Sequence, residues 1–297
     1  MDICKMKYRF FLCSLLHIPL IGAFFKLPAQ NDMIHPPSKE GQFYLTWGYN
    51  RAFYKPSDIH FQGDGYDFTL LQARAEDMPE KFSKIYFDLS QFTVPQFQFR
   101  LGYYFSKNTA VSAGWDHMKY HLIPVQLLHM SGYIDPEKYP STIYSGNFTD
   151  TPVLYTGEFM DYHHSDGFNF VRLAVEQRLP FWSTCNGKIT AAMNGSASLG
   201  AMIPWTDFTF FGTHHRNKLH VAGYGASLSA AFRIEFLHYL FLQLSAQAGW
   251  CNMPDIMLED HLPSRASQKI TFLERSWSIG GYIPFRKKGN DLRVDQL

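Results

Sequence analysis

The alternation of apolar and polar residues over residues 96–120 constrains the fold of this chain more than any other feature. In the first half, every second residue is large and apolar, and the residues between them are polar or small and include Arg100. After a short turn at residues 106–108, the pattern repeats with Trp115 on the apolar parity and Asp116 on the polar one. Side chains on a strand point to opposite faces with a period of two. Strands with one aromatic face and one charged face are typical of a transmembrane β-barrel, which has lipid outside and a polar lumen inside.

The same alternation recurs along the chain in eight segments. Each has at least the ~9–11 residues that a tilted strand needs to cross a bilayer. The segments are residues 41–53, the two halves of 96–120, 168–179, 188–202, 221–236, 240–250 and 269–285. The sequence therefore predicts an all-β fold, an up-and-down antiparallel transmembrane β-barrel of eight strands. Residues 66–75 and 155–162 also have strand character, which leaves a ten-stranded barrel as an alternative.

Connection lengths and the N-terminus predict the orientation. Short connections (106–108, 181–187 and 237–239) alternate with long ones (54–95, 119–167, 204–220 and 254–267). Outer-membrane barrels keep short turns in the periplasm and long loops outside, so both termini are expected in the periplasm of a Gram-negative cell. Lys5, Lys7 and Arg9 precede an apolar run that ends near Ala29, as in a secretory signal peptide. We expect a signal peptide (1–29), a periplasmic segment (30–40), the barrel with extracellular loops (41–285) and a periplasmic tail (286–297).

The composition agrees with a barrel and argues against other classes. Aromatic residues make up 17% of the chain, charged residues 18%, and the net charge is +1. A barrel lacks long apolar spans because each strand is only half apolar. The near-zero net charge gives no reason to expect a nucleic-acid partner. Cys185 and Cys251 are expected at opposite ends of the barrel, too far apart for a disulfide. No cysteine spacing indicates a metal or redox motif, and no cofactor is predicted.

Charged residues on the inward parity bear on conduction. They are Arg100, Arg172, Glu176, Arg178, Arg233, Glu235 and Glu274. The interior of an eight-stranded barrel is just wide enough to be filled by side chains. Unpaired buried charge is costly, so these groups are expected to pair across a packed, non-conducting lumen. A small porin is the alternative. On the outward parity, Trp47, Trp115 and Trp250 are expected in aromatic girdles near the membrane surfaces.

Several segments carry a resemblance to a known class of proteins. They are YLTWGYNR, RLGYYFSKN, GWDHMKY and HSDGFNF, which start at residues 44, 100, 114 and 164. With the signal peptide and the up-and-down pattern, they resemble uncharacterised outer-membrane β-barrel proteins of Bacteroidetes-type bacteria. The resemblance implies the class and the location and is nearly silent on activity. The chain departs from such barrels by continuing past the aromatic Phe285 as RKKGNDLRVDQL.

A histidine-rich segment at one strand end suggests an enzymatic alternative. Parity puts Asp161, His163 and Ser165 on the outward face, with His117 beside them, and His164 and Asp166 inward. The His-x-Ser element resembles that of the lipid A deacylase barrels, where His acts as base and Ser as nucleophile on a membrane-held ester. A carboxylate would orient His163; Asp161 is the candidate with matching parity, and Glu176, on the opposite face, is a weaker one. The chain departs from the family in having Asp166-Gly167 after the serine, where the family has Asn-Ala.

The remaining histidines and the loops do not single out an activity. Imidazoles suit transition metals. The histidines near the outer rim show no dedicated spacing with a carboxylate, so no specific metal site is predicted; they are His117, His121, His163, His164, His214 and His215. The long loops are rich in aromatic residues and suit contact with a ligand, a partner protein or lipid. The sequence therefore favours an outer-membrane barrel with a structural or binding role exercised through its loops, in contact with outer-membrane lipid.

Overall fold

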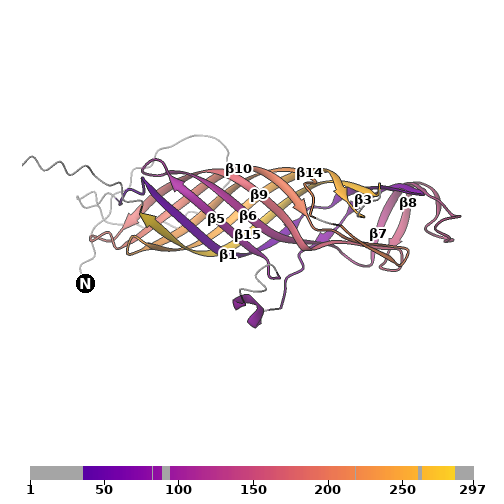
Figure 1. Cartoon of the computed structure of the whole chain (residues 1–297), viewed down its shortest axis with the longest axis horizontal. Coiled ribbons are helices and arrows are strands. Elements are labelled where there is room, and N and C mark those ends of the chain that lie inside the picture. The colour runs from indigo at the N-terminus through magenta and orange to yellow at the C-terminus, as the bar shows by residue number, and fades with distance from the viewer. Residues whose placement is uncertain (1–35, 82, 89–93, 218, 260–262, 285–297) are drawn as a thin grey trace, which may run out of the picture.

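The computed structural model describes residues 36–81, 83–88, 94–217, 219–259 and 263–284 (Figure 1). The expected signal peptide and C-terminal tail lie outside these residues. Eight long antiparallel strands form a closed ring in chain order, and the last pairs with the first over the whole length of β1. They are β1 (Gln42–Tyr54), β5 (Phe97–Tyr104), β6 (Thr109–Leu122), β9 (Met160–Ser183), β10 (Ile189–Pro204), β13 (Gly223–Phe236), β14 (Leu240–Met257) and β15 (Arg265–Pro284). The predicted eight-stranded up-and-down barrel is confirmed.

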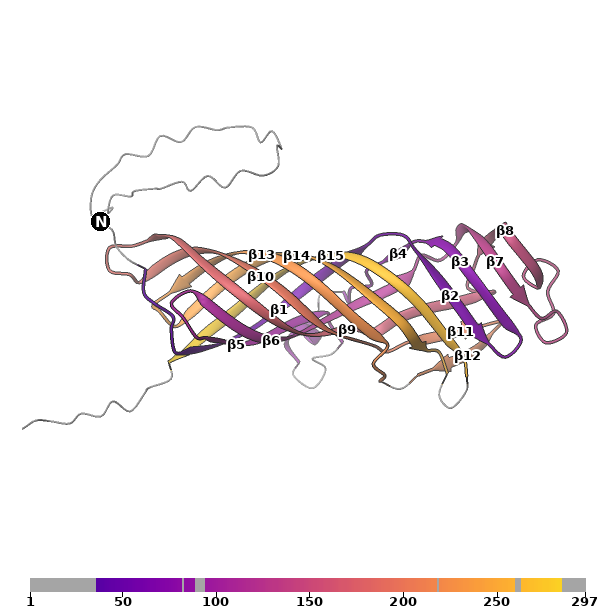
Figure 2. The same cartoon turned by 90° about the horizontal axis from the view of Figure 1, so that it is seen from above.

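The long connections fold into a second sheet region at one end of the ring, which we call the extension. Its strands are β2 (Ser57–Gly63), β3 (Tyr66–Ala73), β4 (Ala75–Glu76), β7 (Gln126–Ile134), β8 (Gly146–Tyr155), β11 (Asp207–Phe210) and β12 (Thr213–Arg216). Strand β2 pairs with the start of β15, and the order β2-β3-β7-β8 carries the sheet away from the ring. Figures 1 and 2 show β7 and β8 at the far end of the long molecule.

The ten-stranded alternative is wrong. Residues 66–75 form β3 of the extension and its continuation, and β3 pairs with β2 and β7 rather than with a strand of the ring. Residues 155–162 contain a turn between the end of β8 and the start of β9. Both segments do contain strand residues, but these residues belong to the sheet that continues the barrel wall beyond the ring.

The two faces of the ring carry opposite chemistry, as the alternation predicts. Large apolar side chains point outward, with Leu173 and Leu199 each 71% exposed and Leu244 62% exposed. Trp250 is also exposed on the outer face, and Trp47 and Trp115 are half-buried against the ring of Phe97. Of the helices that the structure describes, none is long and apolar enough to cross a membrane.

The interior of the extension is an aromatic core. The ring of Phe61 lies 5.2 Å from that of Phe68 and 5.7 Å from that of Phe208, so three strands meet there. The same cluster continues down into the ring as far as Phe170 and Phe272. Fully burying one such side chain contributes about 1.5–3 kcal/mol, so this core can hold the extension together without metal or disulfide.

The strand β9 is twice as long as the sequence pattern indicates. A bulge interrupts the alternation of its side chains, so the pattern shows only part of the strand. It has 24 residues and extends the predicted 168–179 segment mainly into the extension. The register with β6 shifts between Met118 and Tyr120. Gly167 sits at that shift with φ +139, a conformation that favours glycine. Asp166 is therefore exposed, although parity predicts it to point inward.

Candidate functional site

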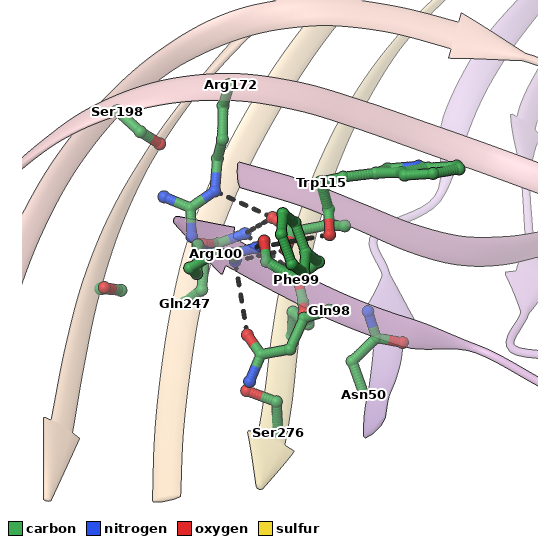
Figure 3. Close-up of polar contacts among 12 residues, drawn as sticks. Asn50, Gln98, Phe99, Arg100, Trp115, Arg172, Ser198, Gln247 and Ser276 are labelled. Carbon is green, nitrogen blue, oxygen red and sulfur yellow. Dashed lines mark hydrogen bonds and ion pairs between the residues drawn. The ribbon is translucent and has the colours of Figure 1, made fainter. Parts of the chain in front are cut away.

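Two groups of polar side chains fill the ring, and a third lies on its outer face near the extension. The first group, the central cluster, surrounds Asp116. Its carboxylate accepts hydrogen bonds from Arg100, from Arg172 Nε at 3.0 Å and from Gln247 Nε2 at 3.1 Å. Gln247 also donates to Glu274 at 3.0 Å. Figure 3 shows Arg100 and Arg172, which come from different strands, with their side chains pointing toward each other.

The second group, the end cluster, closes the ring near the short turns. Arg178 donates two hydrogen bonds to the Glu235 carboxylate, at 2.7 and 2.8 Å, which is the bidentate geometry that arginine favours. Lys39, which precedes β1, lies 3.4 Å from the same carboxylate. The Tyr282 hydroxyl donates to Glu235 at 2.7 Å and accepts from Arg233 at 2.9 Å. Each of these five side chains is buried.

Little open space remains between the two clusters. The cavity there measures about 40 Å³ and is lined by Tyr44, Glu176, Asn194 and Ser196 among others. One water needs about 10–15 Å³, so the cavity holds a few waters at most. Above the central cluster the aromatic core of the extension begins. The seven charged residues expected in the lumen all lie in the interior, and six of them are buried, with Glu176 half-buried.

The third group, the rim cluster, consists of His121, Asp161, His163, Asp207 and His214. Strand pairing builds it: His121 on β6 lies directly opposite His163 on β9, and Asp207 on β11 lies opposite His163 on its other side. Asp161 is two residues before His163 and so shares its face. The neighbouring residues Tyr162 and His164 are fully buried and point into the extension, whereas the rim cluster faces outward and is partly exposed.

The rim cluster alternates histidines with carboxylates. Asp161 lies 3.3 Å from His121 Nε2 and 3.2 Å from His163 Nδ1. Asp207 lies 3.6 Å from His163 Nε2 and 3.4 Å from His214 Nε2. His121, and then His163, hold the pKa of Asp161 far below its usual range. Burial lowers the pKa of His163, but its contacts with Asp161 and Asp207 outweigh this and raise the pKa to about 9.

The structure brings together two of the three residues of the deacylase-like hypothesis. His163 and Asp161 form an ion pair, but among the described contacts none joins Ser165 to either of them. The Ser165 side chain is half-buried beside the bulge at Gly167. A histidine with a pKa of about 9 holds its proton at neutral pH and so is a poor general base. His117 lies further down β6, buried against Asn169 Oδ1 at 2.8 Å.

Sequence reasoning missed residues that complete each cluster. Asp116 has the inward parity, and Arg100 has the same parity on the preceding strand. These two facts could have predicted that Asp116 belongs to the charged groups of the lumen. Lys39 precedes the first strand, and Asp207 lies in a long connection between two strands of the ring. Neither position belongs to a segment with regular alternation, so the sequence pattern does not predict where the two side chains point. His164 is fully buried. Burial, and to a smaller extent the charge on His163, lowers the pKa of His164 to about 3.

The closed ring, the apolar exterior and the filled polar interior define the class, an eight-stranded transmembrane β-barrel. No protein-family model and no curated protein sequence matches the chain. Among solved structures, OprG from Pseudomonas aeruginosa is similar with a TM-score of 0.41 and 11% identity, covering 84% of this chain and 99% of that one. Ail of Yersinia pestis has a TM-score of 0.32 and 11% identity, covering 82% and 99%. Likenesses at this level say nothing about ligand or activity, and the strand pairing carries the fold assignment.

Proposed function

We propose that this chain is an integral outer-membrane protein with a structural or binding role, exercised by the extension at the cell surface while the ring is sealed. The observation that carries the proposal is the contrast between the two ends. The ring is filled by paired charges and has a cavity of only about 40 Å³, whereas the long connections build an ordered sheet. A protein that neither conducts nor exposes a reactive interior acts through its surface.

The surface of the extension supports a binding role. Leu127 on β7 is 69% exposed and pairs with Leu154 on β8, which is 50% exposed. Val125, just before β7, is exposed as well. Exposed apolar side chains that adjoin one another mark interaction sites more often than single ones do. Among the strands that the structure describes, β8 also ends the sheet order and so offers an unpaired edge. A partner protein or an extracellular ligand would be held here.

Contact with outer-membrane lipid is supported by two arginines on the outer face. Arg51 and Arg275 are directly opposite each other on β1 and β15. Like charges in that position repel, and the ion pair with Asp77 compensates Arg51. With Tyr86 of the short helix η1 (Lys84–Phe87) and Trp277, they line a groove of about 620 Å³. Guanidinium groups beside aromatic rings suit the phosphate of a lipid headgroup.

The two ends of the molecule should differ in accessibility on living cells. Cys185 is exposed in the turn between β9 and β10, and Cys251 is buried. A membrane-impermeant maleimide should therefore leave the wild type unlabelled on intact cells but label Glu137→Cys, which lies between β7 and β8. Permeabilising the outer membrane should expose Cys185. Labelling of Cys185 on intact cells would reverse the proposed orientation.

A second expected result separates the sealed barrel from a small porin. Purified protein in planar bilayers should show no stable open channel, because the central and end clusters occupy the lumen. The double variant Arg178→Ala, Arg233→Ala, which empties much of the end cluster, serves as the comparison. A reproducible ohmic conductance of the wild type would support the porin alternative.

The lipid hydrolase alternative gains no support from the geometry. Its proposed base is held between two carboxylates, and its proposed nucleophile lies apart from that base at a bulge. Nucleophilic catalysis needs the base within about 2.6–3.2 Å of the hydroxyl.

A further inference from the structure

We propose that the rim cluster binds a divalent transition-metal cation, with Zn²⁺ as the best-fitting ion, through His121, Asp161 and His163. In the part of the chain that the structure describes, these three side chains form the group of possible metal ligands whose donor atoms all lie within 4.8 Å of one another. Two imidazoles and one carboxylate form a donor set that zinc uses in proteins, and they leave a fourth position for water.

The spacing is close to what tetrahedral coordination requires. Zinc lies at about 2.0–2.2 Å from nitrogen and oxygen ligands, which places the ligand atoms roughly 3.3 Å apart. The carboxylate of Asp161 is already 3.3 Å from His121 Nε2 and 3.2 Å from His163 Nδ1. Rotation of the two imidazoles, which cross at 82° with centroids 5.4 Å apart, is the adjustment that remains.

Asp207 supplies the outer carboxylate that such a site needs. A metal-bound histidine usually directs its second nitrogen to a carboxylate, which orients the ring and strengthens it as a ligand. His163 would bind metal through Nδ1, and its Nε2 faces Asp207 at 3.6 Å. The strand register enforces this, since His163 and Asp207 are direct partners on β9 and β11.

Charge also favours a dication at the rim cluster. Asp161 and Asp207 bring two negative charges to the rim cluster, and a divalent ion with neutral histidines would balance both. His121 is contributed by β6 and the other ligands by β9, so the ion would join two strands at the base of the extension. Binding would therefore also stabilise the folded extension.

Metal titration of the untagged, chelator-treated protein in detergent tests the site directly. We expect isothermal titration calorimetry to give one Zn²⁺ per chain, and Co²⁺ to develop the visible absorption of low-symmetry nitrogen and oxygen coordination. The Asp207→Asn variant should bind about 10- to 100-fold more weakly, as expected for an outer carboxylate. The His121→Ala and Asp161→Asn variants should lose more affinity than that.

The matched control is His129→Ala. His129 is another histidine of the extension, paired with Asp150 at 2.9 Å, and no third possible ligand joins them among the residues that the structure describes. The His129→Ala variant should bind Zn²⁺ with the affinity of the wild type. Heat-dependent gel mobility checks that each variant folds. If the alanine variants fail to fold, Asp161→Asn still tests the site, because it keeps the shape of the side chain. The proposal is overturned if the wild type binds no more tightly than Asp161→Asn, if His129→Ala weakens binding equally, or if Co²⁺ yields no visible bands.

Discussion

Replacing Asp116 by alanine is expected to destabilise the barrel by about 3–5 kcal/mol, because it leaves two buried arginines without their shared partner. Asp116 is fully buried and holds both Arg100 and Arg172, the latter at 3.0 Å. Gln247 would lose an acceptor as well. Urea unfolding of protein in lipid vesicles, followed by tryptophan fluorescence, measures the change in the free energy of unfolding.

A carboxylate of the extension gives the control for this measurement. Asp67 is paired with His60 at 2.8 Å, and both side chains are well exposed, at 62% and 41%. Exposed pairs of this kind contribute about 0–1 kcal/mol, so Asp67→Ala should change the free energy of unfolding little. Equal effects of Asp116→Ala and Asp67→Ala would contradict a packed, charge-paired lumen.

Replacing Leu244 by arginine is expected to cost about 2–4 kcal/mol of stability in the membrane. Leu244 lies midway along the part of β14 that belongs to the ring, and its side chain is 62% exposed on the outer face. A lipid-facing charge at mid-depth must either be desolvated or draw water into the bilayer. Equilibrium unfolding from vesicles is again the measurement.

The cost should depend on depth along the same strand. Asn252 is on the same parity of β14, eight residues nearer the extension, where its amide donates to the Tyr224 hydroxyl at 3.2 Å. Near the membrane surface an added arginine costs only about 0–1 kcal/mol. Asn252→Arg should therefore be tolerated. If it is as costly as Leu244→Arg, the assignment of the apolar band is wrong.

The candidate site was predictable only where a strand period applied. The inward parity of Arg172 and Arg233 follows from the pleat, so their place in the lumen could be inferred without knowing their partners. The partners come from strand pairing around the ring: Asp116 is on β6 and Arg172 on β9, 56 positions later. A one-dimensional pattern places a side chain on a face but does not say which groups meet across the interior.

The amino-acid sequence by itself determined the barrel, because lipid outside and packed polar groups inside impose a period of two on every strand that crosses. It also favoured eight crossing strands, since each carries that period over a full span, but it left ten open, and only the strand pairing decided between the two. Only the tertiary structure decided what the long connections do. The strands in these connections are short, and the bulge at Gly167 interrupts the alternation in β9, so the sequence pattern could not predict how the connections fold. The rim cluster depends on that folding, because register between β6, β9 and β11 is a long-range property that places His121, His163 and Asp207 side by side.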